Sequence, residues 1–99
     1  MTRKQLLRFV KLRNKSDFPS NFQFLLDAEH AGFQPDDLGT AQRFTVDGFI
    51  GYQWNVPTKE GTARMVEFGR RLYVQGEPGS DEMFELMNTA TFIADEKAA

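Results

Sequence analysis

The chain contains no cysteine, a single histidine and no long apolar run. Without cysteine it forms neither disulfides nor thiolate metal sites, and it offers no cysteine nucleophile. A helix that spans a bilayer needs about 18 consecutive apolar residues, and no segment approaches that length. The basic N-terminus lacks the continuous apolar segment of a secretory signal. From these absences we expect a cytoplasmic protein with no membrane partner.

Residues in the pattern of a catalytic or metal centre are also scarce. The possible co-ligands of the histidine, His30, are the carboxylates of Asp27 and of Asp36 or Asp37, whereas a catalytic zinc site usually requires three good protein ligands and here only one is a nitrogen. No serine stands in a Gly-x-Ser-x-Gly elbow. The glycines of segments 48–51 and 76–79 do not form a phosphate loop. We therefore expect no enzyme activity, no metal site and no cofactor.

What the chain does have is the length of one small domain, 1–99, and an excess of phenylalanine. Ten phenylalanines, two tyrosines and one tryptophan supply large apolar rings. Each such ring removes about 150–250 Å² from water when it is buried. A few rings can therefore hold a thin core together, and a ring left on the surface is a candidate contact.

Charge is arranged in blocks, although the net charge is only −2. Residues 1–16 carry six bases and no acid, and residues 76–99 carry six acids and one base. Between them, an acidic block at 17–50 precedes a more basic block at 51–75. Such blocks either pair with one another or form outer faces of opposite potential. The sequence leaves both arrangements open.

Apolar periodicity predicts helices near both ends of the chain. A first helix at 3–14 follows Thr2, a suitable capping residue. A second helix at 21–31 ends before Gly32, which suits the left-handed position after a helix. A last helix is predicted over 81–95.

The middle of the chain changes to a β pattern. Asp47 and Gly48 lie between two runs of β-forming residues, which is a strong signal for a hairpin over 43–56. With a two-residue turn there, Val46 lies opposite Phe49.

Residues 60–74 fit two structures. As a helix they place Met65, Phe68 and Leu72 on one stripe, and as strands they flank a turn at Gly69. The helix is the favoured prediction.

Together the elements predict a small single α+β domain in which three to four helices pack around a central β-hairpin. A winged-helix-like arrangement, with the hairpin as the wing, is a variant of this fold. Asp36 and Asp37 argue against the variant, because a DNA-reading helix should not present carboxylates to phosphate.

Two groups of side chains are candidate binding surfaces. The first is a row of cations on the first helix, the basic stripe, which suits phosphate or an acidic partner and is otherwise a solvated helix face. Its members are Lys4, Arg8, Lys11 and Lys15, and Arg64, Arg70 and Arg71 are candidates to extend it. The second is the aromatic hairpin, which suits a protein partner or base stacking and is otherwise part of the core. Its members are Phe49, Tyr52 and Trp54.

These features favour a non-enzymatic protein-binding domain that acts through segregated charge and the aromatic hairpin. It would be a small adaptor or inhibitor, of the kind that phages and plasmids often encode, or a subunit of an assembly. One alternative is a nucleic-acid-binding regulator that uses the basic stripe. Another is a self-associating structural protein, a homo-oligomer held by exposed Phe49 or Trp54 or by an unpaired hairpin edge.

Overall fold

The computed structural model describes residues 1–15 and 21–94. The first half contains two α-helices, a short 3-10 helix and two strands: α1 (Arg3–Lys15), α2 (Asn21–Ala31), η1 (Pro35–Leu38), β1 (Gln42–Val46) and β2 (Phe49–Thr58). The second half contains two strands, a short α-helix, a 3-10 turn and a final strand: β3 (Gly61–Phe68), β4 (Arg71–Val74), α3 (Asp81–Leu86), η2 (Met87–Thr89) and β5 (Thr91–Phe92).

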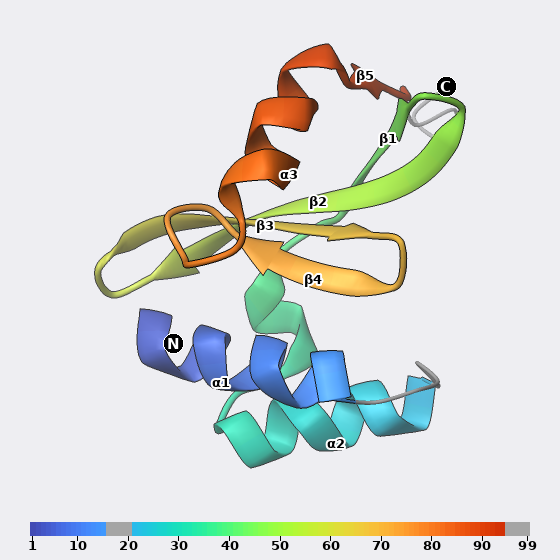
Figure 1. Cartoon of the computed structure of the whole chain (residues 1–99). Helices are drawn as coiled ribbons and strands as arrows, with labels where there is room; N and C mark the ends of the chain where they lie inside the picture. The colour runs from blue at the N-terminus through green and yellow to red at the C-terminus, as the bar shows by residue number, and fades with distance from the viewer. Residues whose placement is uncertain (16–20, 95–99) are drawn as a thin grey trace.

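The strands form one antiparallel sheet in the order β4-β3-β2-β1-β5. Figure 1 shows that α1 and α2 lie on one side of this sheet and α3 on the other. The predicted α+β class is therefore confirmed. The central hairpin is present, but further strands on both sides extend it into a five-stranded sheet.

The start of α1 and the end of α2 are as their sequences predict, while the residues just before α2, 16–20, lie outside the described part of the chain. At the start of α1, the hydroxyl of Thr2 accepts from the backbone N–H of Gln5, whose side chain accepts in return from the backbone N–H of Thr2. At the end of α2, Gly32 adopts a φ of +91°. The N–H groups of Gly32 and Phe33 then donate to the last free carbonyls of the helix.

The β1–β2 hairpin has the predicted turn and register. Asp47 and Gly48 have φ values of +52° and +80°, as a two-residue hairpin turn requires. Val46 pairs with Phe49, and Thr45 pairs with Ile50. This register places Phe49 on the α3 side of the sheet.

The favoured helix over 60–74 is wrong, and the strand alternative is correct. Residues Gly61–Phe68 form β3, and Arg71–Val74 form β4. Gly69 and Arg70 make the turn between them with φ values of +59° and +64°. Apolar and polar residues do not alternate regularly along β3, because this strand is covered on both faces. Its apolar residues therefore point to both sides of the sheet.

The last helix is shorter than the predicted range 81–95. It begins after Ser80, as expected, but the Ser80 side chain makes no capping hydrogen bond. The α-helix ends at Leu86, and residues Thr91–Phe92 pair with β1 instead. The N–H of Ile93 also donates to the carbonyl of Arg43, 2.8 Å away. Pairing with an open sheet edge thus replaces the last turns of the predicted helix.

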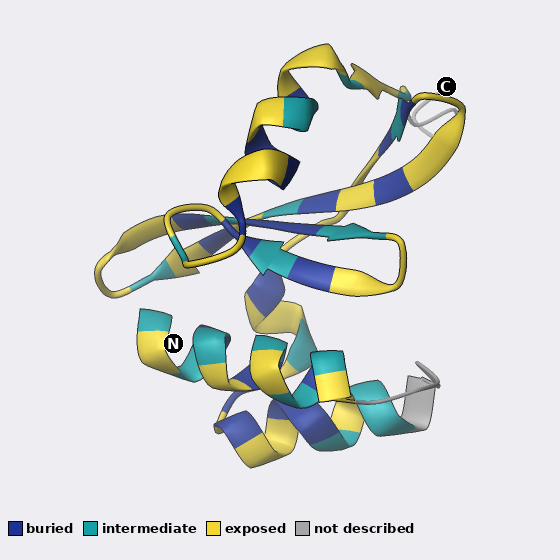
Figure 2. Ribbon diagram, viewed as in Figure 1, coloured by how far each residue is buried: buried dark blue, intermediate teal, exposed yellow. Residues whose placement is uncertain are grey.

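The two faces of the sheet have separate cores. The core under α1 and α2 consists of Leu6, Phe9, Ala28, Ala31, Phe33, Leu38, Val56, Ala63, Met65, Leu72 and Val74. The core under α3 consists of Phe44, Val46, Val66, Met83, Phe84 and Met87. Figure 2 shows the buried positions along the middle of the sheet, while the turn of the β1–β2 hairpin is exposed. In the described ranges, no helix is long and apolar enough to cross a membrane.

Candidate functional site

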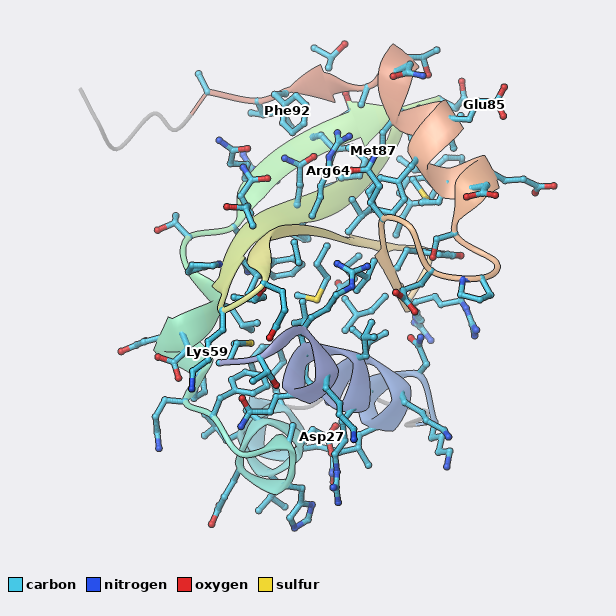
Figure 3. The ribbon with its side chains drawn as sticks, turned by 90° about the vertical axis from the view of Figure 1, so that its left-hand side faces the viewer. Asp27, Lys59, Arg64, Glu85, Met87 and Phe92 are labelled. Atoms are coloured by element: carbon cyan, nitrogen blue, oxygen red, sulfur yellow. The ribbon has the colours of Figure 1, made fainter. Side chains whose placement is uncertain are left out.

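The cations of α1 divide into one that is buried and several that are exposed. Arg13 is buried, and its guanidinium lies 3.1 Å from a carboxylate oxygen of Asp27 on α2. It also lies 5.2 Å from the centre of the Phe24 ring, and the amide of Gln23 donates to the other Asp27 oxygen. Asp27 is labelled in Figure 3. This network fastens α1 to α2 and is not available to a ligand.

The basic stripe lies on the outer surface. Its four members, Lys4, Arg8, Lys11 and Lys15, are all exposed. Over residues 1–15 and 21–94, the ion pairs are Arg3–Glu77 and Arg13–Asp27, and neither includes a stripe residue. The charge blocks of the sequence therefore pair in part, while the stripe keeps its positive potential.

A groove of about 490 Å³ runs between α1 and the edge strand β4. We call it the α1–β4 groove. Its lining is contributed by one flank of α1, by β4 and by the following turn: Leu7, Val10, Lys11, Asn14, Lys15, Arg71, Leu72, Tyr73, Val74, Glu77, Pro78, Gly79 and Ser80. Such a volume is within the usual range for ligand sites. Half of the basic stripe, Lys11 and Lys15, thus belongs to a concave site.

The charge inside this groove is positive. Lys11 and Lys15 come from α1, and Arg71 comes from β4. The acid in the lining, Glu77, is held by the guanidinium of Arg3 at 2.9 Å. Glu77 is therefore already paired, and the two lysines of α1 are left to face an incoming group, with Arg71 at the edge of β4.

The other two candidates to extend the basic stripe, Arg64 and Arg70, do not line the α1–β4 groove. Arg64 lies on the α3 side of the sheet, where its guanidinium is 5.4 Å from the centre of the Phe84 ring. Its Nε donates to the side-chain oxygen of Gln53 over 2.7 Å, and Figure 3 shows it near Met87. Arg70 is exposed in the β3–β4 turn and does not line the groove.

The residues of the aromatic hairpin do not share one surface. Phe49 is 67% exposed and faces the α3 side, where its ring meets that of Phe68 edge-on. Tyr52 and Trp54 lie on the opposite face, with ring centres 6.5 Å apart. Trp54 is half-buried against the core under α1 and α2. Trp54 is therefore mainly a core residue, while Phe49 and Tyr52 are accessible.

Two further apolar residues are exposed nearby, Phe92 on the α3 side with Phe49, and Ile50 on the opposite face with Tyr52. Ile50 is 56% exposed, and Phe92 on the edge strand β5 is 45% exposed. The ring of Phe92 lies 5.9 Å from that of Phe44. We call Phe49, Ile50, Tyr52 and Phe92 the apolar end. The sequence pattern placed Ile50 next to Tyr52, but it gave no signal for Phe92 because residues 91–92 were expected to be helical.

No metal centre emerges from the described residues. His30 is exposed on α2, and no group of three His, Asp or Glu side chains is arranged to hold an ion in the described part of the chain.

No protein-family model matches this chain, and neither a curated protein nor a solved structure matches it significantly. The basic stripe with its groove and the apolar end are therefore the surfaces from which a function can be inferred.

Proposed function

We propose that the protein is a non-enzymatic protein-binding domain that contacts its partner through the apolar end. The observation that carries this proposal is the exposure of four large apolar side chains, two on each face, at one end of a sheet whose middle is covered on both faces. Figure 1 shows the turn of the β1–β2 hairpin on the α3 side, away from α1 and α2. Apolar groups gathered in this way favour burial against a second surface.

The composition of this end suits a protein partner. Aromatic residues dominate the centres of protein interfaces because they bury a large area with few rotatable bonds. Polar groups stand beside them, since Tyr52 lies opposite Arg43 on β1 and Glu67 on β3. An apolar centre with a polar rim is the usual arrangement of such interfaces.

This role agrees with a small adaptor or inhibitor, or with a subunit of an assembly. In either case the domain acts by occupying a surface of its partner rather than by chemistry. A cytoplasmic site of action and a phage or plasmid origin belong to the same proposal.

The test compares exposed apolar residues at two places. The variant F49S/F92S removes two rings from the apolar end, and L25S removes an apolar side chain that is 52% exposed on α2. Each protein is used to capture partners from an extract of its source cells, and the captured protein is then purified and titrated by calorimetry. We expect the wild type and L25S to bind it equally, and F49S/F92S to bind at least about tenfold more weakly.

The proposal fails if F49S/F92S binds as the wild type does. It also fails if no partner is captured and the pure protein sediments as a monomer at every concentration. Self-association that F49S/F92S abolishes would instead assign the apolar end to contacts between copies of this chain.

A nucleic-acid-binding regulator is the second candidate, and it is favoured by the exposed basic stripe, which forms no ion pair with any residue that the structure describes. The winged-helix-like variant of the fold belongs to this candidate. Binding would weaken steeply with salt, because neutralised phosphates release counterions. Changing Lys4, Arg8, Lys11 and Lys15 together to Gln should abolish it, and binding that survives this change would exclude the stripe as the contact.

A further inference from the structure

We propose that the α1–β4 groove is a second binding site, which takes an extended acidic segment of a partner protein. The site is separate from the apolar end, because none of its lining residues belongs to that surface. The proposal therefore stands or falls independently of the role of the apolar end.

Charge indicates an anionic occupant. Lys11 and Lys15 on α1, and Arg71 at the edge of β4, have no acidic partner within the described residues. Arg3 already holds Glu77, so the lining offers no unpaired carboxylate that would repel an incoming acid. Cations that line a groove raise the positive potential within it.

The spacing of the two lysines fits an extended chain. Residues four apart on a helix are separated by about 6 Å along its axis. Alternate side chains of an extended chain are separated by about 6.6 Å. Acids at alternate positions of an extended segment can therefore meet Lys11 and Lys15 in succession.

The floor of the groove selects a peptide over nucleic acid. Leu7 and Val10 line it and are partly exposed, and they suit the apolar side chains that would lie between the acids. A single nucleic-acid strand is usually held by several aromatic rings on which bases stack. This lining contains one aromatic side chain, Tyr73, so it lacks such a platform.

The edge of β4 determines how the segment is held. The side chain of Asn14 already binds both the N–H and the carbonyl of Leu72. The segment therefore cannot pair with Leu72 as an added strand. It is bound mainly through its side chains, and its affinity should depend strongly on Lys11 and Lys15.

The test uses a fluorescein-labelled peptide of alternating Glu and Val, eight residues long, with a Gln-Val peptide and oligothymidine as comparison probes. Two variants receive the same change of net charge: K11E/K15E alters the groove, and K4E/R8E alters the rest of the stripe. Lys4 and Arg8 are exposed on the same helix but do not line the groove, so they are matched controls. Circular dichroism verifies that each variant is folded.

In anisotropy titrations we expect the Glu-Val peptide to bind more tightly than either other probe. K11E/K15E should weaken this binding about tenfold or more, and K4E/R8E by about twofold or less. Amide chemical-shift changes should fall on 7–15 and 71–80. F49S/F92S should bind the peptide as the wild type does, which separates this site from the apolar end.

Three results would overturn the proposal. If K11E/K15E and K4E/R8E weakened peptide binding equally, the binding would depend on the overall positive potential of the basic stripe and not on the groove. Tighter binding of oligothymidine would favour a nucleic-acid surface. Absence of measurable peptide binding by the folded wild-type protein at low salt would show that the groove does not take such a segment.

Discussion

Asn14 of α1 binds the backbone of Leu72 in both directions. Its side-chain nitrogen donates to the Leu72 carbonyl at 3.0 Å, and its side-chain oxygen accepts from the Leu72 N–H at 2.8 Å. Leu72 lies on β4, an edge strand of the sheet. A side-chain amide thus takes the place of a neighbouring strand and protects the edge from pairing with another chain.

We expect Asn14→Ala to lower the free energy of unfolding by about 1–3 kcal/mol, because two part-buried backbone groups lose their partners. Lys15→Ala is the control, since Lys15 is the next residue of the same helix and is exposed. Urea unfolding measures the difference. Equal midpoints for the two variants would show that water replaces the Asn14 amide without loss.

The Arg13–Asp27 pair provides a second stability prediction. Both side chains are less than a tenth exposed, at 7% and 4%. Arg13→Met leaves the Asp27 carboxylate buried without its charge partner, and we expect a loss of about 3–5 kcal/mol. Arg13→Met combined with Asp27→Leu should recover most of that loss, because an apolar pair replaces the ions. Thermal or urea unfolding of the wild type, of Arg13→Met and of the double variant measures these differences in stability.

The Arg3–Glu77 pair is the control for this prediction. Its side chains are about one third exposed, at 32% and 33%, so Arg3→Met should cost about 1 kcal/mol or less. If Arg13→Met were no more harmful than Arg3→Met, burial would not be what makes the Arg13–Asp27 pair important.

The sequence predicted correctly those features that depend only on residues close together in the chain, namely helix ends and a hairpin turn. The cap at Thr2, the C-terminus of α2 at Gly32, and the Asp47–Gly48 turn each depend on a few neighbouring residues. Their hydrogen bonds and backbone angles are formed within the segment. Such signals can be read without knowledge of the rest of the fold.

Residues 61–74 were predicted wrongly because their structure depends on distant partners. Met65 faces the core under α1 and α2, whereas Val66 faces the core under α3. A strand that is buried on both faces has apolar residues at consecutive positions, and such a run also fits a helical stripe. The pairing with β2 decides between the two structures, and the segment alone carries no information on it.

The candidate surfaces were predictable only in part for the same reason. The exposure of the basic stripe followed from helical spacing, but nothing in the spacing showed that Lys11 and Lys15 face β4. The buried role of Arg13 depends on Asp27 in another helix. The exposed position of Phe92 follows from its place in β5, and β5 forms by pairing with the edge of β1.

Gly51 gives a third prediction, which concerns close packing. A Cβ atom at this position would overlap Cζ of Phe44 and would lie 2.8 Å from the carbonyl oxygen of Glu67. One of these neighbours is backbone, so the site cannot relax by rotating a side chain alone. We expect Gly51→Ala to destabilise the fold by about 1–3 kcal/mol.

Asn55→Ala is the control for Gly51→Ala, since Asn55 is an exposed residue of the same strand. Its effect should stay within about 0.5 kcal/mol. Chemical denaturation monitored by the fluorescence of Trp54 compares the two. A Gly51→Ala protein as stable as the control would mean that β2 and β3 separate at this point without cost.

A pair of phenylalanines on the same face of the β1–β2 hairpin separates the requirements of folding from those of binding. Phe44 is fully buried under α3, whereas Phe49 is 67% exposed. Phe44→Ala should lower the free energy of unfolding by about 3–5 kcal/mol, because it opens a cavity in the smaller core. Phe49→Ala should change it by about 1 kcal/mol or less, because most of its ring already contacts water. Urea denaturation of both variants measures this contrast. If Phe49→Ala were as destabilising as Phe44→Ala, Phe49 would be needed for the fold itself, and its exposure would no longer support a role in partner binding.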